Sequence, residues 1–139
     1  MVGEYQHTLD AKGRMNFPAK LREELGESFV ITKTIGSRCL RVYTMESWDN
    51  LVQAIKSKPS SKTAQIERFL FGGACTAEPD KQGRILIPSN LRGYANLTSE
   101  VVVVGLSDRA EIWDKAAWNE LNSTFDDDEL EELAMELEL

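Results

Sequence analysis

Two short segments of this chain carry the same charged residues at the same spacing. The first, DAKGR, begins at Asp10 and ends at Arg14, and the second, DKQGR, begins at Asp80 and ends at Arg84. The planar guanidinium of arginine suits a phosphate group, or the O6 and N7 atoms of guanine. Each aspartate stands close enough in sequence to pair with its arginine. The repeated residue types therefore favour nucleic-acid binding at two related corners.

The aspartates and glycines of these segments have a different expected role, which is to shape a turn. In Asp-x-x-Gly the aspartate side chain can cap its own backbone, and glycine is favoured at the fourth position. We expect Asp10 with Gly13, and Asp80 with Gly83, to form hairpin corners. The simplest alternative is a purely structural turn, but an exposed ion pair contributes only about 0–1 kcal/mol. The turn residues would then orient the arginines, which bind DNA.

Polar residues beside the arginines extend the expected binding surface. The first corner adds Lys12, and the second adds Lys81 and Gln82. We expect Arg14 and Arg84 to be the main DNA contacts, supported by these three residues, because a β-hairpin or ribbon is an established way to enter a groove. One chain with two such corners would bind weakly, so several copies acting together would be needed.

The corners belong to a duplication that spans most of the chain. With an offset of 70 residues and no gap, residues 10–51 align with residues 80–121, and the copies agree at more positions than chance allows. Identical residues beyond the corners stand at Pro18/Pro88, Leu21/Leu91, Arg22/Arg92, Ser37/Ser107, Trp48/Trp118 and Leu51/Leu121. Each copy predicts a strand, a hairpin turn, a strand, a short helix, two further strands and a longer helix.

The ends of the predicted helices carry matching signals in both copies. Proline is tolerated in the first turn of a helix, so Pro18 and Pro88 are predicted to begin the short helices. Gly26 and Asn96 follow these helices, and both residue types tolerate the left-handed conformation. Before the longer helices, the predicted N-caps are Thr44 and Asp114. The tryptophans of the longer helices are predicted to lie on the face that packs against the core.

Four short strands per copy are too few for an independent core, so the two copies are expected to fold together. A closed barrel would leave no strand edge exposed. We expect an α+β, β-rich, pseudo-twofold barrel with flanking helices, forming one integrated domain. The first repeat spans 1–56 and the second 74–125; a linker and helix occupy 57–73, and an acidic amphipathic helix occupies 126–139. Within the linker, SKPSSKT is predicted to be a loop and AQIERFLFGG a helix.

The acidic residues of the chain are concentrated at its C-terminal end. The net charge is −7, but residues 126–139 hold eight acids and no base, whereas residues 1–125 hold 15 acids and 16 bases. The body is therefore nearly neutral, which leaves a nucleic-acid partner open. Leu130, Leu133 and Leu137 recur at helical spacing, so we expect this segment to pack one side on the body or on a neighbour.

The strongest rival interpretation makes Asp10 and Asp80 the acid–base pair of an enzyme, because two related aspartates can share a proton. Here each aspartate is followed by an arginine four residues later, which favours its ionised form. His7 is the only histidine, and its equivalent position is Ala77, so a repeated histidine-dependent site is excluded. We therefore expect no enzyme, no cofactor and no small-molecule substrate.

The remaining residue types point to a reducing compartment. Cys39 and Cys75 lack the spacing and histidine partners of metal ligands, so we expect no metal site. No segment has the roughly 18 to 20 apolar residues of a membrane span, and the first residues do not resemble an export signal. We expect a cytoplasmic protein without a membrane partner.

The motifs together resemble the MraZ family. The resemblance is carried by DAKGRMNFPAKLRE, DKQGRILIPSNLRGYA and EIWDKAAW, and it covers essentially the whole chain. It implies tandem AbrB-like halves that form a swapped-hairpin barrel and assemble into a ring, such as an octamer or dodecamer.

The resemblance also implies a function. It implies a sequence-specific regulator, expected to be a repressor, that binds short direct repeats in the promoter of its own division and cell-wall gene cluster. Such a protein would lie in the cytoplasm and at the nucleoid. An AbrB-like antitoxin or a protein-interaction adaptor, with the C-terminal helix as its binding element, is the alternative.

Overall fold

The two sequence copies form matching sets of elements in the computed structural model, which describes residues 1–58 and 60–139. The first copy contains β1 (Val2–Thr8), β2 (Arg14–Asn16), α1 (Ala19–Leu25), β3 (Phe29–Lys33), β4 (Leu40–Thr44) and α2 (Met45–Lys56). The second contains β5 (Cys75–Ala77), β6 (Arg84–Leu86), α4 (Ser89–Tyr94), β7 (Glu100–Leu106), β8 (Ala110–Asp114) and α5 (Lys115–Ser123). Two further helices follow α2 and α5, namely α3 (Ser61–Leu70) and α6 (Asp127–Glu136). The predicted order of strands and helices in each copy is confirmed.

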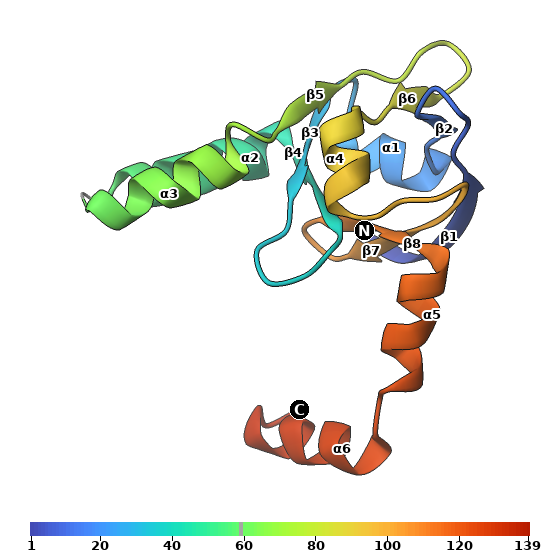
Figure 1. The fold of residues 1–139 in the computed structure, drawn as a ribbon. Helices are drawn as coiled ribbons and strands as arrows, with labels where there is room; N and C mark the ends of the chain where they lie inside the picture. The colour runs from blue at the N-terminus through green and yellow to red at the C-terminus, as the bar shows by residue number, and fades with distance from the viewer. Residues whose placement is uncertain (59) are drawn as a thin grey trace.

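The copies exchange strands. A six-stranded antiparallel sheet has the order β1-β7-β8-β4-β3-β5, and a second sheet contains β2 and β6 (Figure 1). The first strand of each copy pairs with the third strand of the other, as β1 with β7 and β5 with β3. The remaining strand pairs between copies join equivalent strands, β4 with β8 and β2 with β6. The mixed α+β class and the twofold relation of the halves agree with the prediction.

Residues from both copies fill one hydrophobic core. Phe17 and Phe29 are tilted against each other with ring centroids 5.2 Å apart. The short helices contribute Leu21 and Leu91, which are both buried. The chain at the end of β6 alternates in the manner of a half-buried strand: Ile87 is 0% exposed, whereas its neighbour Leu86 is 56% exposed. Interdigitation of the two copies therefore extends from the strand pairing into the core.

The helix ends agree with the prediction in most places. Gly26 and Asn96 have φ values of 85° and 52°, in the left-handed region. Thr44 caps α2, because its hydroxyl accepts a 3.0 Å hydrogen bond from the backbone N–H of Ser47. The short helices begin one residue later than predicted, because Pro18 and Pro88 have ψ values of 125° and 155° and act as N-caps.

Asp114 occupies the predicted N-cap position of α5, but its side chain does not cap the helix. Instead, Asp114 Oδ1 accepts hydrogen bonds from the backbone N–H of Thr98, at 3.1 Å, and from the Thr98 hydroxyl, at 2.6 Å. The carboxylate thus ties the loop after α4 to the start of α5, and this competing partner becomes available only in the folded chain.

Helices α2 and α3 form an antiparallel arm that extends away from the sheets (Figure 1). Its helix α3 begins three residues earlier than predicted, because the Ser60 hydroxyl accepts a hydrogen bond from the Lys62 N–H. The predicted loop at 57–63 is thus shorter, and its Pro59 lies outside the described residues. Trp48 is half-buried rather than in the core, and it contacts Phe71 edge-on with centroids 5.4 Å apart.

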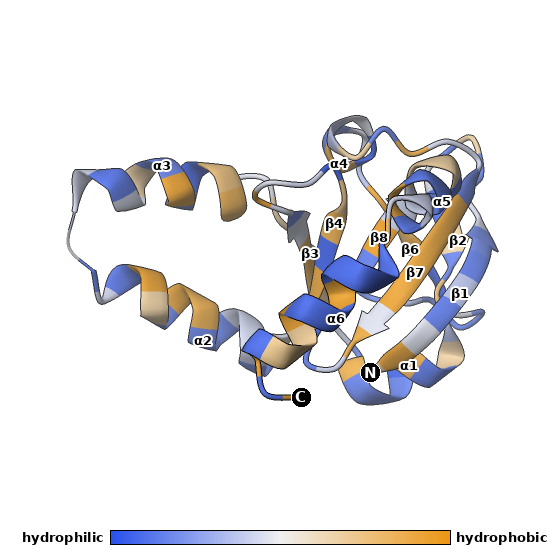
Figure 2. Ribbon diagram, turned by 90° about the horizontal axis from the view of Figure 1, so that it is seen from below, coloured by the Kyte–Doolittle hydropathy of each residue, from blue (hydrophilic) through white to orange (hydrophobic). Residues whose placement is uncertain are grey.

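The C-terminal helices follow β8, which is the neighbour of β4 in the six-stranded sheet. Helix α5 is anchored by Trp118, whose ring lies 5.7 Å from that of Trp113. Helix α6 then turns away, and Leu130, Leu133 and Leu137 remain 45%, 52% and 69% exposed (Figure 2). The expected packing of α6 on the body of its own chain is therefore not observed. Among the described residues, no helix has the length and apolar character needed to cross a membrane.

The alternation at the end of β6 generates a stability prediction. Replacing Ile87 by Ala should lower the free energy of unfolding by about 2–5 kcal/mol, because it leaves a cavity in the shared core. Leu86→Ala, one residue away on the exposed face, should cost less than about 1 kcal/mol. Urea denaturation of the two variants beside the parent would test this, and equal losses would contradict the assigned faces.

Candidate nucleic-acid interface

Each predicted corner is a turn closed by its aspartate. In the first corner, Asp10 Oδ1 accepts hydrogen bonds from the backbone N–H groups of Lys12 and Arg14, both at 2.9 Å. The Gly13 N–H donates to the Asp10 carbonyl at 3.0 Å, and Gly13 has a φ of 88°. This left-handed conformation explains why glycine stands there.

The second corner repeats this geometry closely. Asp80 Oδ1 accepts from the backbone N–H groups of Gln82 and Arg84 at 2.9 Å, and the Gly83 φ is 79°. The agreement of distances shows that the sequence repeat is also a repeat of the turn. The predicted role of the aspartates and glycines in shaping the corners matches what the structure contains.

The second oxygen of each aspartate holds the adjacent arginine side chain. Arg14 Nε donates to Asp10 Oδ2 at 3.1 Å, and Arg84 Nε donates to Asp80 Oδ2 at the same distance. Both arginine side chains remain about two-fifths exposed, at 42% and 39%. Because the aspartates bond to Nε, the terminal amino groups of the guanidinium can extend toward a ligand.

The same hydrogen bonds keep the carboxylates ionised. The pKa of Asp10 lies below its ordinary value, chiefly because the backbone N–H of Arg14 donates to it, with the Arg14 side chain and the Lys12 N–H adding to the effect. The pKa of Asp80 is lowered in the same way by Arg84 and Gln82. Two stably ionised aspartates are unsuited to share a proton, which argues against an acid–base pair.

Two backbone hydrogen bonds bring the corners together. The Phe17 N–H donates to the Gly83 carbonyl at 2.9 Å, and the equivalent Ile87 N–H donates to the Gly13 carbonyl at 2.8 Å. Strands β2 and β6 pair in the same region, with Arg14 opposite Leu86. The two arginines therefore rise from one short ribbon, at the end of the molecule away from the β3–β4 turn (Figure 1).

The other predicted site residues lie on the exposed surface of the same corners. Lys12 is exposed in the first, and Lys81 and Gln82 are exposed in the second. The ribbon thus brings all five predicted DNA contacts into one region. The flanking residues differ between the corners, so the two halves of the surface are not chemically equal.

Two arginines that brace the corners were not predicted as site residues. Arg22 Nε donates to the Phe17 carbonyl at 3.0 Å, and Arg92 Nε donates to the Ile87 carbonyl at 2.9 Å. The guanidinium of Arg22 also lies against Gly83, where an added Cβ would be 2.7 Å from its Cζ. Arg92 contacts Gly13 in the same manner. The identity of Arg22 and Arg92 in the repeat was the only sequence signal, because the glycines that they contact lie in the other copy.

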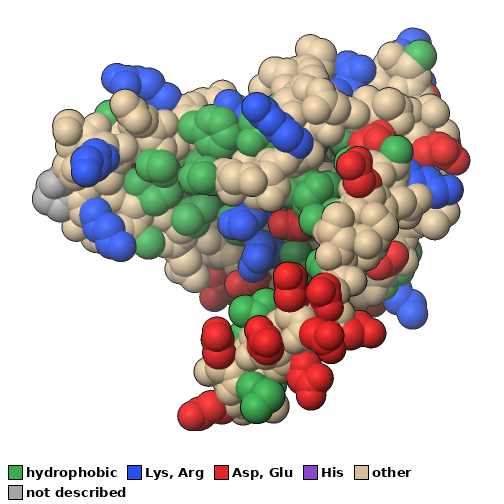
Figure 3. All heavy atoms as spheres, turned by 60° about the horizontal axis from the view of Figure 1, so that its bottom comes forward, with side chains coloured by type: hydrophobic (Ala, Val, Ile, Leu, Met, Phe, Trp, Pro, Cys, Tyr) green, Lys and Arg blue, Asp and Glu red, His purple; other side chains and the backbone are tan. Residues whose placement is uncertain are grey.

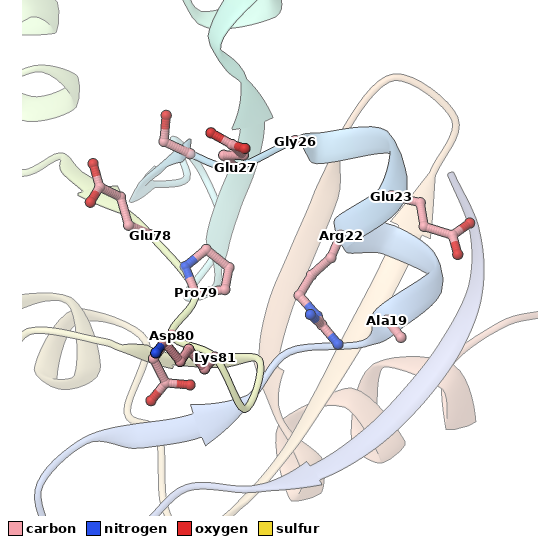
Figure 4. A pocket seen from close by; sticks show the side chains of 10 residues that line it. Ala19, Arg22, Glu23, Gly26, Glu27, Glu78, Pro79, Asp80 and Lys81 are labelled. Carbon is pink, nitrogen blue, oxygen red and sulfur yellow. The ribbon is translucent and has the colours of Figure 1, made fainter.

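A cavity of about 910 Å³ opens beside the second corner, between α1 and the loop that leads into β6 (Figure 4). Asp80, Lys81 and Arg22 line it, together with three glutamates, Glu23, Glu27 and Glu78. The surroundings of the two corners differ, because Leu97, the equivalent of Glu27, packs on the core. The acidic lining makes this cavity unsuitable for a phosphate backbone.

The histidine and the cysteines, which were considered as catalytic or metal-binding residues, are partly or fully buried in the fold. His7 is half-buried in β1, and burial lowers its pKa. Cys39 is buried and hydrogen-bonded to Thr34, and burial raises the pKa of its thiol to about 11. Within the described residues, no group of three or more histidine, cysteine or acidic side chains could hold a metal ion.

A family model described as "MraZ protein, putative antitoxin-like" matches residues 1–68 and matches again at 70–137. The chain belongs to the MraZ family. The double match confirms the predicted resemblance and the predicted duplication, and it places each Asp-x-x-Gly-Arg corner in its own family repeat.

Similar MraZ proteins come from several bacteria. A relative from Thermoanaerobacter sp. (strain X514) is 48% identical over 128 residues, which is 91% of this chain and 89% of the relative. One from Moorella thermoacetica is 51% identical over 121 residues, 86% of this chain and 84% of the relative. One from Acetivibrio thermocellus is 50% identical over 118 residues, 84% and 82% respectively. All three are named "Transcriptional regulator MraZ".

The lowered aspartate pKa values generate a pH prediction. A carboxylate whose pKa is lower in the folded than in the unfolded chain stabilises the fold above its ordinary value, 3.8 here, and this contribution is lost as the pH falls through the folded value. Asp10→Asn with Asp80→Asn removes it at every pH. Stability measured from pH 7 down to acid should therefore decline less steeply in the double variant, and parallel curves would contradict the assignment.

The close approach at Gly13 generates a second prediction. Gly13→Ala should destabilise the protein more than Gly36→Ala, although both glycines have a φ of 88°. Both variants carry the left-handed backbone cost of about 1–2 kcal/mol. Only a Cβ at Gly13 meets other atoms, at 2.7 Å from the Ile87 carbonyl, whereas none lies within 4 Å at Gly36. Thermal unfolding of both variants measures the difference, which should vanish if the corner is loosely packed.

Proposed function

We propose that this chain is a non-enzymatic transcriptional regulator that binds double-stranded promoter DNA through the β2–β6 ribbon. The observation that carries the proposal is the pair of aspartate-held arginines, Arg14 and Arg84, which stand on the two paired strands of one ribbon formed by both copies. The names of the relatives support the regulatory role.

The arginines are assigned to recognition and the aspartates to positioning. A guanidinium fixed through Nε loses little freedom when its terminal amino groups meet a phosphate or a guanine edge. Lys12, Lys81 and Gln82 are exposed beside it and can reach the neighbouring backbone of the DNA. Gly13 and Gly83 let the turns form, so they act on DNA only through the arginines.

The proposed assembly is a ring of several copies, as the family resemblance implies. A chain with a net charge of −7 gains little from general attraction to DNA, so two corners per chain need reinforcement by other copies. A ring would meet short direct repeats in the promoter of the division and cell-wall gene cluster and repress it, at the nucleoid. We also propose that the two sheets close into an AbrB-like barrel, which the hydrogen bonds from Phe17 and Ile87 favour.

Replacement of the two arginines tests the DNA-binding proposal. The variant Arg14→Ala/Arg84→Ala should bind promoter DNA at least about tenfold more weakly in mobility shifts, because each arginine supplies a charged contact. The slope of log affinity against log salt should flatten by about 0.9 for each phosphate that the variant no longer neutralises.

Arg38→Ala is the matched control. Arg38 lies in the β3–β4 turn, stacked on Tyr94 with its Cζ 4.6 Å from the ring centroid, and away from the ribbon. Its replacement should leave affinity and salt slope unchanged. Unchanged binding by the double variant, with its fold intact by circular dichroism, would overturn the assignment.

An antitoxin or adaptor is the second candidate, favoured by the description of the family model and by the exposed leucines of α6. Such a protein would capture a partner protein through α6. Removal of residues 126–139 would then abolish the capture of a co-encoded toxin in a pull-down assay. DNA binding by the intact chain, with no toxin captured, would favour the regulator alone.

A further inference from the structure

The arm and the C-terminal helix are related elements with opposite charge. Helix α3 follows α2 in the first copy as α6 follows α5 in the second, and both pairs fall within the family repeats. At the same offset of 70, four bases of the arm region stand where the C-terminal region has acids. The pairs are Lys56/Asp126, Lys58/Asp128, Lys62/Glu132 and Arg68/Glu138. One chain therefore carries a basic and an acidic version of one appendage.

The acidic version has an apolar face that nothing in its own chain covers. Leu130 and Leu133 of α6, and Leu137 directly after it, are 45% to 69% exposed. The helix is nevertheless well formed, since the Asp126 side chain accepts a cap hydrogen bond from the Asp128 N–H at 2.9 Å. An exposed leucine stripe on a regular helix is typical of a helix that docks on another surface.

The basic version offers a surface of matching chemistry. A groove of about 390 Å³ runs between α2 and β5, and its apolar lining includes Trp48, Val52 and Phe71. Lys56 stands at this groove, and Lys58 and Lys62 lie beyond it toward the tip of the arm. Figure 3 shows hydrophobic side chains along the arm with Lys and Arg around them, and a dense group of Asp and Glu over the C-terminal helix.

The positions of α5 and of the groove disfavour docking of α6 on the arm of its own chain. Stacking of Trp118 on Trp113 fixes α5 at β7 and β8, whereas the groove lies beside β5, at the far edge of the six-stranded sheet. Only residues 124–126 link α5 to α6, a reach of about 10 Å. Figure 1 shows α6 below the body and the arm extending to the left of the body.

We propose that α6 of one copy docks on the arm of a second copy, with its leucines in the groove and its acids facing the lysines. The two surfaces differ, so the contact is head-to-tail, and repetition produces a closed ring or an open chain. This inference rests on one part of the proposed function, namely that several copies act together on DNA.

Reversal of charge tests the contact. An arm variant, Lys58→Glu/Lys62→Glu/Arg68→Glu, and a tail variant, Asp128→Lys/Glu132→Lys/Glu138→Lys, should each weaken self-association about tenfold or more, measured as mass in solution by sedimentation. Asp126 is kept, because it caps α6. Lys20→Glu, an exposed charge change on α1, should leave the mass unchanged.

Mixing the variants separates a specific contact from a general effect of charge. The acidic arm of one variant matches the basic tail of the other, so an equimolar mixture should regain the mass of the parent. A chain that carries both reversals should also self-associate. Leu130→Ser/Leu133→Ser should lower the mass without unfolding the chain, since both side chains are exposed.

Several results would overturn the docking proposal. They are a parent protein that is monomeric, an unchanged mass in both charge variants, or a mixture that fails to regain the parent mass. Failure of the docking proposal is distinguishable from failure of the DNA-binding proposal, because the Arg14→Ala/Arg84→Ala variant should keep the mass of the parent. Normal assembly without DNA binding by the parent would instead contradict the proposed function and leave the contact intact.

Discussion

The exchange of backbone hydrogen bonds between the two copies is the constraint on which the rest of this structure depends. The bonds from Phe17 to Gly83 and from Ile87 to Gly13 place a residue of one copy against the turn of the other. Arg22 and Arg92 then fill the space over the glycines. Each corner is thereby fixed by contacts with the opposite copy. The result is an arginine pair whose separation is set by the fold rather than by flexible side chains.

Local features of the site were predictable because their causes are local. An aspartate, a glycine and an arginine within five residues suffice to define the turn, and the distances in the two corners agree to within about 0.1 Å. The left-handed residues Gly26 and Asn96 were predictable for the same reason. In each case the sequence contains both the residue and its hydrogen-bond partner within one turn.

Features that depend on a distant partner were missed. Asp114 has the residue type and position of an N-cap, but Thr98, 16 residues away, takes its carboxylate. Arg22 and Arg92 were visible as repeated residues, yet their bracing role depends on contact with the other copy. The exchange of strands came from the family resemblance, since the alternation of apolar residues in a strand does not identify its neighbour. The two copies also diverge where their surroundings differ, as Glu27 and Leu97 do.

The pairing of β1 with β7 also has a consequence for how the chain is made. Val2 lies opposite Leu106, so the first strand waits for most of the polypeptide to be synthesised before its neighbour exists. At about 5–20 residues per second, the ribosome takes several seconds to provide it. During that interval the backbone N–H and C=O groups of β1 are unpaired, and they can form hydrogen bonds with other chains. Glu4 and the glycine at position 3 make that waiting strand a poor template for aggregation.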